Sequence, residues 1–296
     1  MGEPRYSRRT LLAAIGVVIA TATGVATYVS SSSTGVVEQQ IATADKVRAP
    51  APAAAKPLIR FERVYSAARH REVTLAFYLP SGVNPRGLPM SILLHGLNGD
   101  ARHAAVGELP SVLATAVAKG SVPAFGFIAV DGGNNYWHEN VPGDDPMAML
   151  LDEIPRWLKE RGYGEPFAVT GTSMGGFGSL LYARRRAERG DPIAAAAAIS
   201  PGLITTWPEM AKRRAFKNEG EWASLDPLRH LKATGSTAVG VWIGDRDKFI
   251  EGTRRFIRDA RPLVGTVKGG GHDDGLYRKV TPDVVQFLAK YAKRAV

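Results

Sequence analysis

The sequence contains no cysteine. This absence excludes disulfide bonds, metal sites built from thiolates and a cysteine nucleophile. It does not locate the protein, because a chain without cysteine is compatible with any compartment. No histidine and carboxylate cluster with the spacing of metal ligands is visible, since His95 and His103 are eight residues apart and have no matching acidic set. We therefore expect neither a metal nor any other cofactor.

Acidic residues are outnumbered, with 28 Asp and Glu against 38 Lys and Arg, which gives a formal net charge of +10. A basic surface can attract nucleic acid, anionic lipid headgroups or acidic polymers. No nucleic-acid-binding motif accompanies the charge, so we expect no nucleic-acid partner. An anionic envelope surface stays open as a partner, beside the simpler interpretation that the charge keeps the protein soluble.

The first 44 residues have the features of an export signal. Arg8 and Arg9 precede an uncharged run from Leu11 to about Val29, as in a twin-arginine signal. That run is about as long as a membrane span, so an uncleaved anchor stays open. Residues 45–57 are rich in Ala and Pro, which predicts a stiff tether. In either case we predict an extracytoplasmic domain, secreted or tethered to the outer face of the cytoplasmic membrane.

Residues 58–296 have a length that suits one domain with a large core. Strand-like and helix-like segments alternate along them, and no internal repeat is visible. This order predicts an α/β fold with a mostly parallel central sheet and helices on both faces. We expect the domain to be a monomer.

The most informative segment, residues 166–178, reads P-F-A-V-T-G-T-S-M-G-G-F-G. A predicted strand at 166–170 leads into the pattern G-x-S-x-G, and a predicted helix starts at Gly176. This is the strand–turn–helix context of a nucleophile elbow, with Ser173 as the nucleophile. The flanking glycines have a steric reason, because a Cβ at either flank would clash in so sharp a turn. The alternative is a glycine-rich turn with an incidental serine.

A serine nucleophile needs a histidine to take its proton and a carboxylate to orient that histidine. After such an elbow, the acid comes first along the chain and the histidine follows. Two histidines follow Ser173, namely His230 and His272. His272 comes after three glycines and a predicted strand at 263–267, which places it on an exposed loop. His230 lies in D-P-L-R-H-L-K, a predicted helix that faces solvent, so we favour His272.

The acid is expected after the predicted strand at 239–243, where Asp245 and Asp247 follow. Asp245 stands next to Gly244 and has the features of a turn residue. We therefore favour Asp247 as the acid, and the choice between the two aspartates stays open.

The loop after the predicted strand at 90–94 reads H-G-L-N-G. An oxyanion hole needs a backbone donor from this loop, and the N–H of Leu97 is the candidate beside the N–H of Met174. His95 precedes Ser173 along the chain, whereas the catalytic histidine of this arrangement follows the serine and the acid. We expect His95 to brace the loop at the edge of the substrate site.

Two further segments are expected to shape that site. Residues 131–137 (D-G-G-N-N-Y-W) follow a predicted strand at 125–130, and Asn135, Tyr136 and Trp137 offer amide groups and stacking faces for a substrate. The alternative is a packed loop whose aromatic rings plug the edge of the core. Residues 201–232, with Trp207, Met210, Phe216 and Trp222, predict a small helical lid.

Residues from about 58 to 293 resemble the esterase branch of the α/β-hydrolases, which includes esterase D-like enzymes and the secreted mycolyltransferases of mycobacteria. The matching motifs are H-G-L-N-G (95–99), D-G-G-N-N-Y-W (131–137), D-E-I-P-R-W-L (152–158), G-T-S-M-G-G (171–176), G-D-R-D (244–247) and G-G-H-D (270–273). The resemblance implies an α/β-hydrolase fold with a small lid after strand 6.

The mycolyltransferases also pair a Gly-Leu oxyanion loop with a Ser-Met elbow, which implies Leu97 and Met174 as the donors. They usually carry a glutamate as triad acid and lack a histidine at the position of His95, so here the chain looks more like ordinary esterases. We expect an exported serine esterase that acts on small-molecule, lipid or sugar esters through an acyl-enzyme. Three alternatives stay open: an acyltransferase to a sugar or another envelope hydroxyl, a non-catalytic wall- or carbohydrate-binding protein, and a serine peptidase on the same scaffold, for which no segment specifies a peptide pocket.

Overall fold

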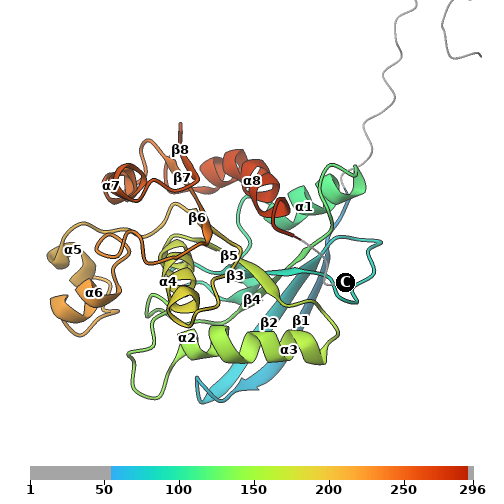
Figure 1. Cartoon of the computed structure of the whole chain (residues 1–296), viewed down its shortest axis with the longest axis horizontal. Helices are drawn as coiled ribbons and strands as arrows, with labels where there is room; N and C mark the ends of the chain where they lie inside the picture. The colour runs from blue at the N-terminus through green and yellow to red at the C-terminus, as the bar shows by residue number, and fades with distance from the viewer. Residues whose placement is uncertain (1–54, 293–296) are drawn as a thin grey trace, which may run out of the picture. The chain divides into compact units, whose positions relative to one another are not determined.

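One eight-stranded sheet, in the order β1-β2-β4-β3-β5-β6-β7-β8, forms the centre of the computed structural model (Figure 1). The structure describes residues 55–292, so the predicted leader and most of the predicted tether lie outside the described residues. The strands are β1 (Leu58–Ser66), β2 (Arg71–Leu79), β3 (Met90–Leu94), β4 (Gly126–Val130), β5 (Pro166–Thr172), β6 (Ala195–Ile199), β7 (Ala238–Gly244) and β8 (Val264–Lys268).

Strand direction decides where a site can form. β1 and β2 make an antiparallel hairpin, and β2 pairs antiparallel with β4, whereas β4, β3 and β5 to β8 run parallel to one another. β3, β4 and β6 are buried at every position, because helices cover both faces of a parallel sheet. The carboxyl ends of the parallel strands meet at one edge, where the loops of such sheets bind ligands.

Helices cover the two faces of the sheet. The helical segments are η1 (Ala101–His103), α1 (Leu109–Ala118), α2 (Pro146–Ala148), η2 (Met149–Glu153), α3 (Ile154–Glu160), α4 (Met174–Glu188), α5 (Trp207–Ala211), α6 (Glu219–Leu225), α7 (Ile250–Ala260) and α8 (Asp274–Ala289). Apolar side chains of α3, α4 and α7 pack into the core on one face, and those of α1 and α8 pack on the other. The predicted mostly parallel sheet with helices on both faces is therefore confirmed.

The predicted strands agree with the structure to within one or two residues, but one helix prediction is wrong. His230 was expected in a helix, yet residues 227–236 form turns. The carboxylate of Asp226 accepts the N–H of Leu228 at 2.9 Å, and the N–H of Arg229 bonds back to the Asp226 carbonyl oxygen. An aspartate that bonds its own backbone two residues on favours a turn over a helix.

The segment after β6 folds as a small helical lid made of α5 and α6, which lie apart from the sheet at one end of the molecule in Figure 1. The rings of Trp207 and Trp222 stack at 6.1 Å between their centroids and join the two helices. The buried ring of His138 donates from Nε2 to the Ala215 carbonyl oxygen at 2.6 Å and stacks on Phe216. These contacts fasten the lid to the loop after β4.

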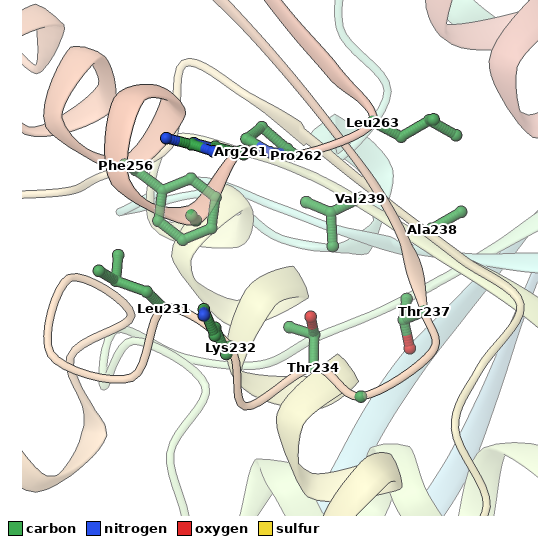
Figure 2. A pocket seen from close by; sticks show the side chains of 12 residues that line it. Leu231, Lys232, Thr234, Thr237, Ala238, Val239, Phe256, Arg261, Pro262 and Leu263 are labelled. Carbon is green, nitrogen blue, oxygen red and sulfur yellow. The ribbon is translucent and has the colours of Figure 1, made fainter.

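A cavity of about 410 Å³ lies at the amino edge of the sheet, opposite the carboxyl ends of the strands. Thr237, Val239 and Leu263, at the starts of β7 and β8, line it together with Phe256 of α7 (Figure 2). In the part of the chain that the structure describes, no helix is both long and apolar enough to cross a bilayer.

Candidate active site

Ser173 occupies the sharp turn between β5 and α4, with φ 59° and ψ −118°. A serine with positive φ is strained, and such strain persists only where the surroundings fix the backbone. The Ser173 N–H donates to the Ile199 carbonyl oxygen at 3.0 Å, which ties the turn to β6. A Cβ on Gly171 would overlap the Gly175 carbonyl, and a Cβ on Gly175 would overlap the Leu94 carbonyl. The two glycines of the pattern therefore have the steric role that the sequence predicts.

Three side chains from three loops meet at the carboxyl edge of the sheet. The Ser173 hydroxyl and Nε2 of His272 are 3.0 Å apart, within hydrogen-bond distance. On its other side, Nδ1 of His272 is 2.9 Å from Oδ2 of Asp247. The Asp247 side chain is fully buried, whereas that of His272 keeps 18% of its surface exposed. This arrangement can move a proton from the hydroxyl to the imidazole.

The charge of Asp247 is held in place by hydrogen bonds. Burial alone would raise the pKa of this carboxyl, but the bonds from His272 and from the Phe249 N–H outweigh it and lower the pKa from its ordinary value. The carboxylate therefore stays ionised at neutral pH. An ionised carboxylate fixes the ring orientation and keeps the Nδ1 proton toward itself.

Asp245, the other candidate acid, is exposed and has a different contact. Its Oδ1 accepts the Gly270 N–H at 3.0 Å, a bond that lowers the pKa of this carboxyl. Asp245 thus supports the loop that carries His272, while Asp247 contacts the ring. His230 lies within the lid region instead, with Nε2 at 3.2 Å from the Ala223 carbonyl oxygen.

The two predicted oxyanion donors lie beside Ser173. Met174 is the first residue of α4, and the first N–H groups of a helix have no partner within it. The positive end of the helix dipole also favours a negative charge at this point. A Cβ on Gly96 would lie 3.5 Å from the Ser173 Cβ, so the loop that carries Leu97 passes directly against the serine. Both backbone segments can therefore face an oxyanion held at Ser173.

The side chains of His95 and Trp137 lie beneath the loop that carries Leu97. The His95 side chain is buried, donates from Nδ1 to the Gly96 carbonyl oxygen at 2.8 Å and accepts the Gly132 N–H at Nε2. Burial lowers the pKa of His95, in keeping with a neutral ring. Trp137 is also buried, and its Nε1 donates to the His95 carbonyl oxygen at 3.3 Å. Both rings therefore support the loop that carries Leu97 from inside, and both are almost fully buried.

Asn135 and Tyr136 lie between the core and the site. The Asn135 amide donates to the His138 carbonyl oxygen at 3.0 Å, so it shapes the loop. Tyr136 is 2% exposed, and a Cβ on Gly202 would touch its ring at 3.4 Å and the Met174 nitrogen at 3.5 Å. Burial raises the pKa of Tyr136 to about 12. Most of this loop therefore packs against the core, which was the alternative interpretation of the sequence. The Tyr136 ring borders Gly202, next to the Met174 nitrogen.

Sequence reasoning missed Phe249. Its N–H donates to Oδ1 of Asp247 at 2.9 Å, and its ring stands edge-on to His272 at 5.1 Å between centroids. A phenylalanine two residues after the acid gave no signal of this double contact. Among residues 55–292, no group of three or more His, Asp or Glu side chains is arranged to hold a metal ion.

Comparisons with known proteins define the class. Residues 66–257 match the model of the esterase family, described as "Putative esterase". The chain belongs to this family, and the protein is a carboxylic ester hydrolase. No curated protein matches the chain in sequence.

Solved structures share the fold. The chain is similar to a ferulic acid esterase, with a TM-score of 0.67 and 19% identity over 80% of this chain and 99% of that chain. It is similar to an S-formylglutathione hydrolase from Agrobacterium tumefaciens, with a TM-score of 0.65 and 16% identity over 81% of this chain and 97% of that one. It is also similar to a fluorophosphonate-binding serine hydrolase, FphF of Staphylococcus aureus, with a TM-score of 0.62 and 15% identity over 79% of this chain and 99% of that one. At such low identity these likenesses show the fold alone, and it is the predicted α/β-hydrolase fold.

Proposed function

We propose that the protein is a serine esterase that cleaves its substrate through an acyl-enzyme on Ser173, with His272 as base and acid and Asp247 as the orienting carboxylate. The observation that carries this proposal is the unbroken hydrogen-bonded line from Ser173 through His272 to Asp247, at 3.0 and 2.9 Å. A hydroxyl, an imidazole and a buried carboxylate in this order form the arrangement that activates a serine.

The reaction follows from these contacts. Oγ of Ser173 attacks the ester carbonyl carbon while Nε2 of His272 takes the hydroxyl proton. The carbonyl oxygen becomes an oxyanion, and the N–H groups of Leu97 and Met174 donate to it. The bond to the leaving alkoxide then breaks, and His272 returns the proton to that oxygen. Water, deprotonated by His272, next attacks the acyl carbon. The bond from that carbon to Oγ of Ser173 then breaks, His272 returns its proton to Oγ, and the acid leaves. One lost oxyanion donor lowers such rates about 100- to 1000-fold.

A fluorophosphonate probe tests the nucleophile. The wild-type protein should become labelled, and peptide mapping should place the label on Ser173. The Ser173→Ala variant should lose both labelling and ester hydrolysis, while Ser121→Ala, a change at an exposed serine, should keep both. Labelling that survives Ser173→Ala would reject the assignment. Glycan binding without labelling or turnover would favour the non-catalytic alternative.

Transfer to a hydroxyl other than water is the second candidate. The observation that favours it is an exposed amide pair next to Leu97: the Asn98 N–H donates to Oδ1 of Asn134 at 2.7 Å, and Nδ2 of Asn134 donates to Oδ1 of Asn98 at 2.9 Å. Exposed amides of this kind can bind a polar alcohol. Incubation with a short acyl ester and excess trehalose or glycerol separates the two functions. New sugar or glyceryl esters indicate transfer, and free acid alone indicates hydrolysis.

We also propose that the enzyme acts outside the cytoplasmic membrane. The support is the Arg8-Arg9 pair before the uncharged run, as in a twin-arginine signal. Fusion of residues 1–57 to a reporter that is active only after export should give signal, and Arg8→Lys with Arg9→Lys should abolish it. A reporter that stays inside with the native pair would contradict the proposal.

A further inference from the structure

A second, smaller cavity, of about 220 Å³, lies at the carboxyl edge of the sheet. Three segments line it: the loop after β6, the lid helix α5 with the turn that follows it, and the loop that leads from Asp247 into α7. Among the lining side chains are Leu203, Arg213, Lys248 and Phe249. The cavity therefore lies at the same edge as Ser173, unlike the one in Figure 2.

One ring separates this cavity from the proposed catalytic base. Phe249 lines the cavity, and its ring edge meets the His272 ring at 5.1 Å. The guanidinium carbon of Arg213 lies over the same phenyl ring at 5.9 Å from its centroid. Arg213 and His272 thus both contact Phe249, which places a cation close to the histidine side of the site.

The charge of Arg213 also acts on Tyr136, on the oxyanion side of the site. It lowers the pKa of the Tyr136 hydroxyl, although burial has the larger and opposite effect. The Tyr136 ring borders Gly202, and Gly202 borders the Met174 nitrogen. Arg213 thus contacts the ring of Phe249, which borders His272, and its charge acts on Tyr136.

One hydrogen-bond donor of Arg213 has no acceptor within the described residues. This donor is Nε, which is buried although the residue as a whole is partly exposed. Glu209 also lines the cavity but pairs with Lys212. Glu251 lines the cavity as well and is the carboxylate that competes for cations there, with Lys248 as a second cation. A buried charged donor without an acceptor is unfavourable, and an anionic group in the cavity would satisfy it.

We propose that Arg213 binds a carboxylate carried by the ester substrate, so that the enzyme prefers esters with a short anionic arm. This inference rests on the proposed function of Ser173. The planar guanidinium matches a carboxylate with two parallel hydrogen bonds. The cavity is smaller than the pockets of roughly 300 to 1,000 Å³ that hold drug-sized ligands, so the arm has few atoms. The arm belongs to either the acyl or the alcohol part, and the experiment separates these sources.

Two matched ester pairs test the proposal. Monomethyl and dimethyl succinate differ by a carboxylate on the acyl side, and 4-acetoxybenzoate and its methyl ester differ by one on the alcohol side. In a pH-stat, the wild type should have the higher kcat/KM for the anionic member of one pair. Arg213→Gln should raise KM for that member about tenfold or more, as expected for a lost hydrogen bond to a charged group, and change the neutral ester little. Arg213→Lys should keep part of the preference.

The controls separate this inference from the proposed function. Arg254→Gln changes an exposed arginine of α7 and should leave both members of each pair unaffected. Fluorophosphonate labelling of Arg213→Gln at the wild-type rate shows that Ser173 is intact. If Arg213→Gln does not fold, Glu251→Gln serves instead, and it should lower KM for the anionic member. Equal changes for anionic and neutral esters, or no preference in the wild type, overturn the role of Arg213. Absent labelling and turnover of every ester contradict the proposed function instead.

Discussion

Gly175 packs so tightly against Leu94 that a Cβ on the glycine would overlap the Leu94 carbonyl oxygen and carbon. The start of α4 thereby lies directly on the carboxyl end of β3. This contact brings the elbow and the oxyanion loop together, because the loop begins at the next residue, His95. The approach of two backbones accounts for the last glycine of the G-x-S-x-G pattern.

Gly175→Ala should therefore force the helix away from β3. We expect a loss of at least about 2 kcal/mol of folding free energy, in the range of overpacked core substitutions. Ester hydrolysis should fall more than the stability loss explains, since Ser173 and Met174 move with the helix. Urea unfolding and kcat/KM measure the two effects. Gly269→Ala is the matched control, because a Cβ there meets no atom within 4 Å and should be nearly neutral.

Asp247→Asn tests the acid. An asparagine in this position can donate its amide N–H to Nδ1 of His272, which favours the wrong tautomer of the ring, so kcat should drop about 1,000- to 10,000-fold. Asp245→Asn should lower kcat by less than about tenfold, because its amide oxygen can still accept the Gly270 N–H that bonds to Asp245. Steady-state kinetics on one neutral ester compare the two variants. A larger loss for Asp245→Asn would move the acid to that residue.

His95→Ala separates bracing from acid–base chemistry. The variant loses the acceptor of the Gly132 N–H and the donor to the Gly96 carbonyl oxygen, both of them buried. We expect a loss of about 2–4 kcal/mol of stability and a lower kcat from a displaced oxyanion loop. The shape of the pH–rate profile should not change. A profile that loses one of its limbs would instead make His95 a proton-transfer group.

Asp226 makes stability depend on pH in the lid. Burial raises the pKa of this carboxyl to about 6, whereas the unfolded chain keeps the ordinary value of 3.8. The neutral form is thus favoured in the fold, and its stabilising effect, complete below pH 3.8, is lost as the pH rises through about 6. Asp226→Asn should raise the Tm at pH 7.5 and have little effect at pH 4, with a gain of up to about 3 kcal/mol.

Thermal melts of Asp226→Asn at both pH values check this prediction, with Asp191→Asn as the control. Asp191 is exposed, so its substitution should change the Tm little at either pH. An equal shift of Asp226→Asn at both pH values would show that the carboxyl is ionised in the fold.

Local backbone rules made part of this molecule predictable. The elbow was readable because G-x-S-x-G between a strand and a helix has a steric cause, and the glycine contacts of Gly171 and Gly175 match it. The order of strands and helices gave the sheet, because alternation constrains parallel strands strongly. Strand ends at one edge also explain why residues as distant in sequence as Ser173 and His272 meet.

Side-chain burial was less predictable. Trp137 and Tyr136 follow a strand at the edge of the site, and the sequence alone does not say whether such rings turn outward or inward. Gly132 and Gly178 leave room for the inward Trp137 ring, because a Cβ on either glycine would overlap it. The turn at His230 was missed because an aspartate that caps a turn and one that caps a helix look alike in sequence. Arg213 and Phe249 act through contacts between distant segments, which no local pattern records.

The three side chains of the proposed triad follow the ends of β5, β7 and β8 in one sheet, while the lid and Arg213 belong to the long connection between β6 and β7. Insertions or deletions in that connection leave the strand ends in place. Selectivity can thus drift by loop exchange while the reaction chemistry is preserved. The architecture separates what must stay constant in evolution from what is free to diversify.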